Sequence, residues 1–160
     1  MTSYEDLKEK GNEAFRSKKY DKAIDFYTQA IQAKNDEPAA YSNRAMCHIH
    51  LGNFYEAKED CDRAIKYDPK FVKAYYRRAT ALSRLFRYRL AKRDFRIVLD
   101  LDPSNSSAKK EIDNIDNLID SDARVDLKAY SKPEYCQSNK PVREIELRNR
   151  YSGTISYDNE

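Results

Sequence analysis

Five residues in this chain carry side chains that can bind an anion, and their spacing is regular. They are Lys8, Asn12, Asn43, Lys73 and Arg77. Lys8 and Asn12 are four residues apart, and residues at that spacing are neighbours on a helix. Lys73 and Arg77 repeat the spacing. Lysine supplies a point charge, arginine a planar fork of donors, and asparagine an uncharged amide donor. Together these residues predict a site for carboxylates.

A period of 34 residues identifies the elements that would position these side chains. Asn43 and Arg77 are separated by this period, as are three further sets of similar residues: Tyr20, Phe54 and Tyr88; Ala23, Ala57 and Ala91; and Ala30, Ala64 and Val98. The period is typical of a tandem repeat of helix pairs. Each pair buries its apolar face only against its neighbours, and the stack leaves a concave surface for binding.

The period predicts an all-α solenoid of three helix pairs. The repeats are expected at 4–37, 38–71 and 72–105, with helices at 4–17, 20–33, 38–51, 54–67, 72–85 and 88–101. Small residues in matching phases, Gly11 and Ala23 in the first repeat, should let the two helices of a pair approach closely. Pro69 and Pro103 follow the second helices of their repeats, where proline prevents a helix from continuing.

Two further segments follow the repeats. Residues 106–121 have apolar side chains at helical spacing and a polar opposite face, which predicts a helix that caps the stack and completes a domain at 1–121. An alternative is an amphipathic helix that binds a partner. Residues 122–160 are polar, with Pro133, Pro141 and Gly153, and predict a largely irregular tail, extended or disordered. Its alternative role is a docking segment for an adaptor.

Helical phase places the five candidate residues on one stripe. At 100° per residue, Leu7, Gly11 and Ala14 mark the core side of the first helix, and the candidates lie on the opposite side of their helices. One more position on that side adds Arg16, His50 and Arg84, and the groove beside it would also receive Phe15, Met46, Ile49 and Thr80. The alternative interpretation is an ordinary solvated helix face.

Composition excludes several other function classes. The net charge of +3 is too small to argue for nucleic acid binding, and no apolar run is long enough to predict a membrane span. Cys47, Cys61 and Cys136 have neither disulfide nor zinc spacing. We therefore expect reduced thiols, no cofactor and a cytoplasmic or nuclear protein. His48 and His50 are two residues apart and point to different helix faces, so no metal site or catalytic set is predicted and the chain is not expected to be an enzyme.

The repeats resemble tetratricopeptide repeats, and residues 4–121 are similar to the three-repeat domain of co-chaperones that bind heat-shock proteins. The resemblance is carried by the motifs KEKGNEAF (8–15), KYDKAIDFYTQAI (19–31), YSNRA (41–45) and KAYYRRA (73–79). The chain departs from the repeat pattern at Asn35, where proline stands in the other repeats, and at Cys61, which replaces an aromatic residue.

This resemblance implies a carboxylate clamp for the C-terminal Glu-Glu-Val-Asp of heat-shock protein 90, heat-shock protein 70 or both. By resemblance, Lys8, Asn12 and Asn43 would hold the terminal carboxylate. Lys73 and Arg77 would hold the Asp side chain and nearby carbonyls. The alternative is an assembly scaffold whose repeats and tail recruit an adaptor, with the segment KPVREIEL (140–147) as the docking strand. A version linked to a kinase or phosphatase is a further alternative.

Overall fold

The computed structural model describes residues 3–130, with side chains through residue 121. These residues form seven α-helices: α1 (Tyr4–Arg16), α2 (Tyr20–Ala33), α3 (Pro38–Leu51), α4 (Phe54–Tyr67), α5 (Val72–Arg84), α6 (Tyr88–Leu101) and α7 (Ser106–Tyr130). No strand occurs within the described range, and the expected all-α class is confirmed. Within this range no helix is both long enough and apolar enough to cross a membrane.

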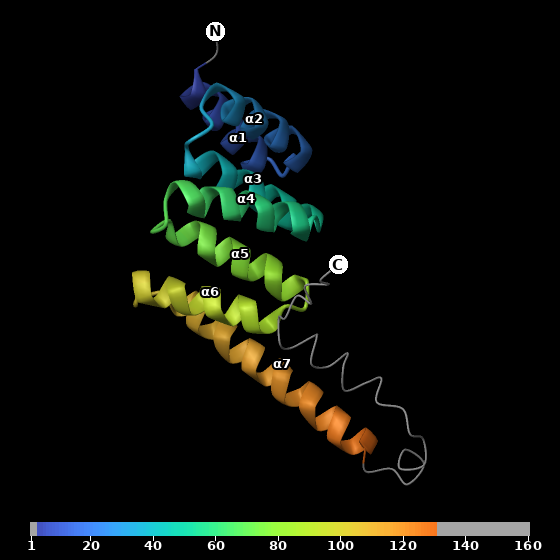
Figure 1. Cartoon of the computed structure of the whole chain (residues 1–160). Coiled ribbons are helices and arrows are strands. Elements are labelled where there is room, and N and C mark those ends of the chain that lie inside the picture. The colour runs from blue at the N-terminus through green and yellow to red at the C-terminus, as the bar shows by residue number, and fades with distance from the viewer. Residues whose placement is uncertain (1–2, 131–160) are drawn as a thin grey trace, which may run out of the picture.

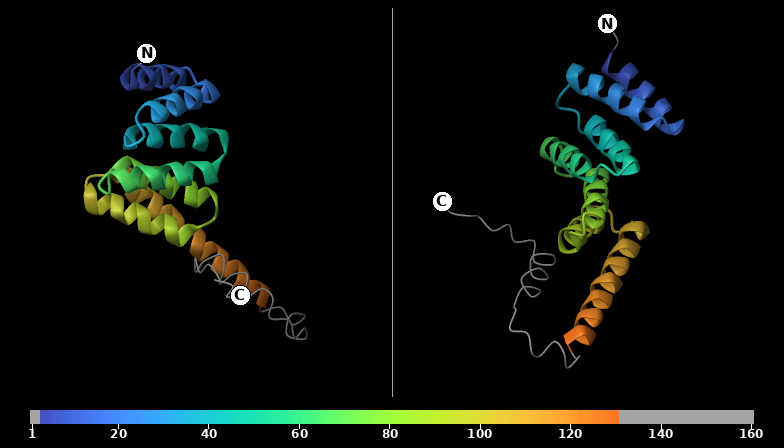
Figure 2. Two further views of the ribbon diagram at one scale, coloured as in Figure 1. Left: turned by 45° about the horizontal axis from the view of Figure 1, so that its top comes forward. Right: turned by 90° about the vertical axis from the view of Figure 1, so that its right-hand side faces the viewer.

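The helices form three consecutive pairs stacked along one direction (Figure 1). The pairs are α1 with α2, α3 with α4 and α5 with α6, and the second helix of each pair also packs against the first helix of the next. Helix α7 packs against α6 and extends obliquely from the end of the stack, as Figure 2 shows from two further directions. The predicted repeat architecture is therefore confirmed, and the bounds of the six repeat helices agree to within about one residue.

The end of α7 corrects the sequence prediction. The capping helix was expected to end at residue 121, with an irregular tail from residue 122, but α7 continues to Tyr130. Residues 122–130 contain helix-forming Ala, Leu, Arg and Lys and neither proline nor glycine, so nothing in them stops the helix. The rest of the tail, including the proposed docking strand 140–147, lies outside the described residues.

Close approach of the paired helices rests on small residues, as predicted. Ala23, Ala57 and Ala91, one in each second helix, are fully buried. Gly11 faces the Tyr27 ring so closely that an added Cβ would lie 2.5 Å from the ring carbon Cε1. At this contact the Tyr27 ring leaves no room for even one methyl group, which fixes the spacing of α1 and α2.

The turn within each repeat also follows the 34-residue period. Lys18, Gly52 and Phe86 have φ angles of 57°, 81° and 59°, in the left-handed region that favours glycine. In each turn the next backbone N–H donates to the carbonyl five residues earlier, at 2.8 to 2.9 Å, a Schellman-type helix ending. Two of the three turns therefore hold a non-glycine residue, Lys18 or Phe86, at a positive φ angle that costs free energy of folding.

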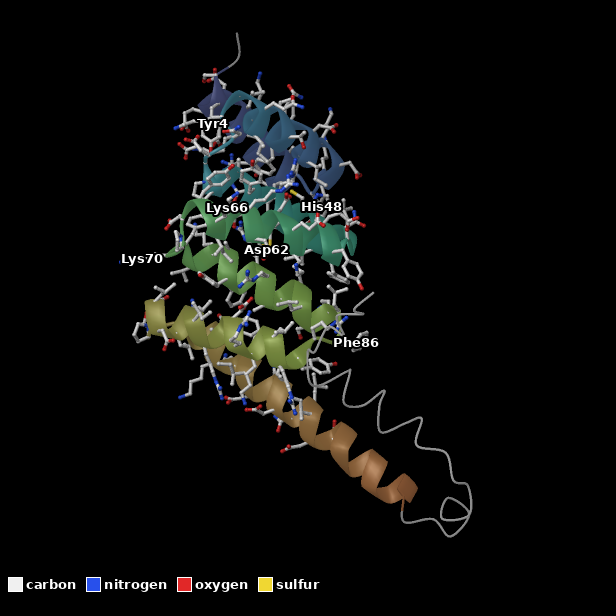
Figure 3. All side chains as sticks on the ribbon, in the orientation of Figure 1. Tyr4, His48, Asp62, Lys66, Lys70 and Phe86 are labelled. Carbon is white, nitrogen blue, oxygen red and sulfur yellow. The ribbon has the colours of Figure 1, made fainter. Side chains whose placement is uncertain are left out.

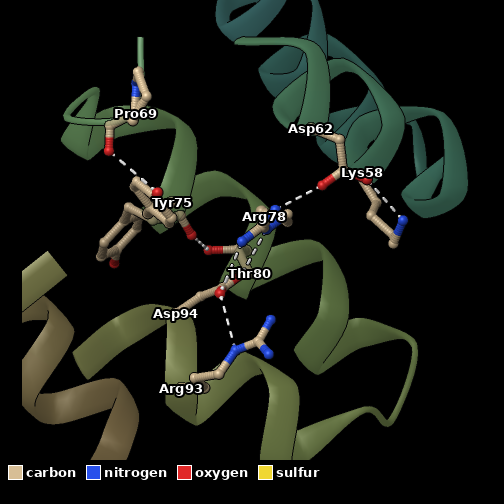
Figure 4. A network of polar contacts seen from close by, with 9 residues as sticks. Lys58, Asp62, Pro69, Tyr75, Arg78, Thr80, Arg93 and Asp94 are labelled. Atoms are coloured by element: carbon tan, nitrogen blue, oxygen red, sulfur yellow. Dashed lines mark hydrogen bonds and ion pairs between the residues drawn. The ribbon is translucent and has the colours of Figure 1, made fainter. Parts of the chain in front are cut away.

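Arg78 joins three helices through one guanidinium group (Figure 4). Its Nε and Nη2 donate to both carboxylate oxygens of Asp94 on α6, at 2.6 and 3.0 Å, and its Nη1 donates to Asp62 on α4 at 2.7 Å. Asp94 is fully buried. Removing one partner from such a buried pair leaves an uncompensated charge, which is strongly destabilising.

The same bridge occurs one repeat earlier. Arg44 on α3 donates to both oxygens of Asp60 on α4, at 2.8 and 2.7 Å, and its Nη1 donates to Thr28 on α2 at 2.9 Å. We call these two contacts the arginine bridges. They were not predicted from the sequence, although Arg44 and Arg78 are 34 residues apart, as are Asp60 and Asp94.

The turn geometry predicts opposite effects at two equivalent positions. Replacing Gly52 by alanine should destabilise the fold by about 1 kcal/mol, because the added Cβ opposes a positive φ. Nothing lies within 4 Å of that Cβ, so the loss would come from the backbone alone. Lys18→Gly should leave the thermal midpoint unchanged or raise it. A drop in the midpoint for Lys18→Gly would show that the φ angle is not the cause.

Candidate anion-binding groove

Three of the five candidate residues form a line of hydrogen bonds across α1, α3 and α5. Arg77 Nη1 donates to Asn43 Oδ1 at 3.1 Å, and Asn43 Nδ2 donates to Asn12 Oδ1 at 3.3 Å. Tyr27 on α2 donates its hydroxyl to the same Asn12 oxygen at 2.8 Å. Residues separated by 65 positions in the sequence thus lie on one continuous surface, as helical phase predicted. Tyr27 was not predicted to support this line.

The two candidate lysines flank this line. Lys8 is partly buried on α1 and pairs with Glu5. Lys73 is exposed on α5 and borders, together with Arg77, a pocket of about 370 Å³ that reaches Asn105 and the start of α7. The structure therefore brings Lys73 and Arg77 to one cavity, while Lys8 stands at the opposite end of the line.

Arg77 is a cation without a carboxylate partner in the described part of the chain. Its Nη1 donates to two neutral oxygens, Asn43 Oδ1 and Ser42 Oγ, the latter at 2.8 Å. Burial of the guanidinium lowers the pKa of Arg77, because removal from water disfavours the charged form. Nearby, burial raises the pKa of Cys47 to about 11 and that of Cys61 to about 12, so both thiols are neutral. In the arginine bridges, by contrast, each guanidinium pairs with at least one carboxylate.

Glu9 is a groove residue that the sequence analysis missed. Its carboxylate accepts from Asn12 Nδ2 at 3.0 Å and from Arg16 Nη2 at 2.6 Å. The hydrogen bond from Asn12, and then that from Arg16, lower the pKa of Glu9. Glu9 lies three residues before Asn12 and seven before Arg16, a helical spacing that would have revealed it. In the free protein, an internal carboxylate therefore occupies the donor of Asn12.

The remaining predicted groove residues lie in two separate regions of the surface. Phe15, Tyr20 and His50 form an aromatic cluster, in which the rings of Tyr20 and His50 stack with centroids 4.6 Å apart. Met46 and Arg84 line a different cavity of about 600 Å³ between α3, α5 and α7. The structure does not bring Phe15, Arg16 and His50 into that cavity.

The larger cavity continues from Arg77 and is mostly apolar. Its lining includes Ile49, Tyr76, Thr80, Phe86 and Leu118. Phe86, labelled in Figure 3 at the turn after α5, is 62% exposed. Tyr76, Phe86 and Leu118 were not predicted from the sequence. Leu118 reaches the cavity because α7 packs against α6.

His48 belongs to the core side of α3 and not to the groove. Its side chain is mostly buried, and its Nε2 lies 3.9 Å from Asp60. Burial lowers the pKa of His48, so the ring is neutral at neutral pH. Among the described residues, no group of three His, Cys, Asp or Glu side chains is arranged to hold a metal ion.

Two family models match this chain. One, for the TPR repeats of BSK1-like serine/threonine-protein kinases, matches residues 1–79, and the tetratricopeptide repeat model matches residues 72–105. Serine/threonine-protein phosphatase T of Aspergillus oryzae is 41% identical over 71% of this chain and 24% of its own length. Human sperm-associated antigen 1 is 39% identical over 91% of this chain and 15% of its own. The chain thus spans about a quarter or less of the length of these relatives.

Two solved structures are similar over nearly their whole length. The tetratricopeptide domain of Arabidopsis OM64 is 43% identical with a TM-score of 0.69, covering 70% of this chain and 93% of that one. The first such domain of Spaghetti (RPAP3), solved with the HSP90 peptide SRMEEVD, is 38% identical with a TM-score of 0.72. The matched region covers 73% of this chain and 93% of the Spaghetti domain.

Two adjacent arginines should respond oppositely to the same substitution. Arg77→Met should change the free energy of unfolding by no more than about 1 kcal/mol, because it removes a partly buried charge that no acid compensates. Arg78→Met should cost about 3 kcal/mol, because Asp94 would remain buried without its cation. Chemical denaturation of both variants measures the difference. Equal losses would show that Arg77 is a structural residue.

Proposed function

Since this chain belongs to the tetratricopeptide repeat family, we propose that its groove binds the C-terminal Glu-Glu-Val-Asp of heat-shock protein 90 or 70. One observation carries the proposal: the line from Asn12 through Asn43 to Arg77 ends in a cation that lacks a carboxylate partner within the described residues. A ligand carboxylate would supply the missing charge. The Spaghetti domain bound to SRMEEVD supports the same ligand class by similarity.

The proposed clamp works by exchanging internal acids for ligand acids. Lys8, Asn12 and Asn43 would hold the terminal carboxylate, which displaces Glu5 from Lys8 and Glu9 from Asn12. Glu5 and Glu9 are largely exposed, so both return to water at little cost. Lys73 and Arg77 would hold the Asp side chain and adjacent carbonyls in the smaller pocket.

The larger cavity would receive the peptide upstream of its end. Arg77 and Arg84 are seven residues apart on α5, which corresponds to about 10 Å along a helix and about three residues of extended peptide. An apolar side chain entering there would meet Met46, Ile49 and Tyr76. Phe15, Arg16 and His50 would contact the ligand from the α1 side of the groove.

The proposed role is a co-chaperone module without catalysis of its own. The repeats would recruit the chaperone in the cytoplasm or nucleus and leave any activity to other parts of a longer protein. The phosphatase relative has such additional length. Adaptor recruitment through the tail is the alternative, and its segment lies outside the described residues.

A free carboxyl terminus should be essential for peptide binding. A peptide ending in Glu-Glu-Val-Asp should bind about tenfold to a hundredfold more tightly than the same peptide with an amidated terminus, because charge-assisted hydrogen bonds would be lost. Isothermal titration calorimetry measures both affinities. Equal affinities would refute the clamp while leaving the fold untouched.

A charge reversal at Lys73 should separate binding from stability. Lys73→Glu should abolish measurable peptide binding, and its thermal midpoint should stay near that of the wild type because the residue is exposed. Lys70→Glu is the matched control, since Lys70 is exposed just before α5 and outside both cavities. If both variants lose affinity equally, net charge and not the groove governs binding.

A further inference from the structure

Positive charge is concentrated in the third repeat and not in the chain as a whole. Residues 70–96 contain ten lysines and arginines but one acid, Asp94, whereas the whole chain has a net charge of only +3. The proposed clamp uses Lys73 and Arg77, and Arg78 is neutralised in its bridge. Most of the remaining cations lie on α6, which contributes no residue to the line of hydrogen bonds.

Three arginines of α6 form one exposed row. Arg89, Arg93 and Arg96 are all exposed, and at 100° per residue they fall within about 60° of one another. The buried residues of the helix, such as Ala91 and Phe95, lie on the opposite side. This row, which we call the arginine face, therefore points away from the core.

The arginine face retains its charge. Arg93 is 65% exposed, and its nearest carboxylate is Asp94 at 3.8 Å, which is already bound to Arg78. Arg89 and Arg96 have no carboxylate within 4 Å among the side chains described through residue 121. By contrast, Lys92 beside them pairs with Asp116 on α7.

The repeat itself shows that packing does not require arginine at positions 89 and 93. The positions equivalent to Arg89 and Arg93 are Asp21 and Asp25 in α2, and Tyr55 and Glu59 in α4. All four are exposed, so the fold accepts acids or a tyrosine there. At these two positions the third repeat carries the charge opposite to that of the first, and the fold accommodates either.

We propose that the arginine face is a second docking site, which binds an acidic segment of a partner protein. Arginine is suited to carboxylates because its planar fork donates two parallel hydrogen bonds. Three arginines over seven residues span about 10 Å, which matches a short run of Asp and Glu. The site stands on α6 and is independent of the proposed clamp on α1, α3 and α5, so both can be occupied together.

Neighbouring acids favour a short acidic segment over nucleic acid. Asp116 of α7 reaches Lys92 of α6, Asp113 and Asp120 lie one turn to either side of it on α7, and Asp100 ends the arginine row. These carboxylates border the face and would repel a long polyanion that extended beyond it. A short acidic segment fits within the border.

The test is a titration with two matched peptides at physiological ionic strength, where exposed charges more than about 8 Å apart are largely screened. The probe is an alanine-based peptide with glutamate at every fourth position, acetylated and amidated so that it offers no terminal carboxylate to the clamp. Its partner peptide has glutamine in place of glutamate. The wild type should bind the glutamate peptide and not the glutamine peptide, and the triple variant Arg89→Glu, Arg93→Glu, Arg96→Glu should weaken binding about tenfold or more.

A charge-matched variant controls for net charge. Lys22→Glu, Arg63→Glu, Lys66→Glu makes the same change at exposed positions on α2 and α4 and should keep the affinity within about twofold. Both triple variants should retain affinity for a peptide ending in a free Glu-Glu-Val-Asp, which keeps this result separate from that of the clamp.

Four outcomes would overturn the proposal. They are equal loss of affinity in the two triple variants, absence of binding by the glutamate peptide, tighter binding of a single-stranded RNA oligonucleotide, and self-association of the wild type that the arginine variant abolishes. The third result would identify a nucleic acid surface, and the fourth a contact with a second copy of this chain.

Discussion

The close contact between the two helices of each repeat is the constraint on which the groove depends. Fully buried alanines at 23, 57 and 91 and the glycine at 11 set the distance between paired helices. Because this distance repeats, residues 34 apart stand at equivalent places on successive helices. Asn43 and Arg77 can share a hydrogen bond only in that register. The side chains proposed to bind the ligand therefore owe their positions to the small residues between the paired helices.

Two neighbouring arginines show how the same side chain serves stability or binding. Arg78 binds the carboxylates of Asp62 and Asp94, and Asp94 is fully buried. The charge of Arg78 is therefore paired within the folded protein. Arg77 points along the groove and meets only neutral oxygens. A partly buried cation with neutral partners costs folding free energy. A ligand carboxylate beside Arg77 would remove that cost, and this is the physical basis of the proposed function.

The sequence predicted what periodicity and helical phase determine. The helix pairs follow from the period of 34 residues. The shared stripe of Asn12, Asn43 and Arg77 follows from that period together with the 100° that each residue advances around a helix. Contacts that depend on side-chain length and rotamer could not be predicted from periodicity. The hydrogen bond from Asn12 to Glu9 is an example. The end of α7 was missed because falling apolar content suggested a tail, although residues 122–130 retain helix-forming residues. The arginine bridges were visible in the period but resembled ordinary surface charge until their burial was known.

The claim that Arg77 is reserved for a ligand carboxylate is tested most directly by a double-mutant cycle. The cycle combines Arg77→Met in the protein with Asp→Asn at the last residue of the peptide, and calorimetry measures all four affinities. If Arg77 meets that side chain, the two changes should couple by about 1 kcal/mol or more. Additive effects, with coupling below about 0.3 kcal/mol, would contradict the account, because the cation would then have no partner in the bound peptide either.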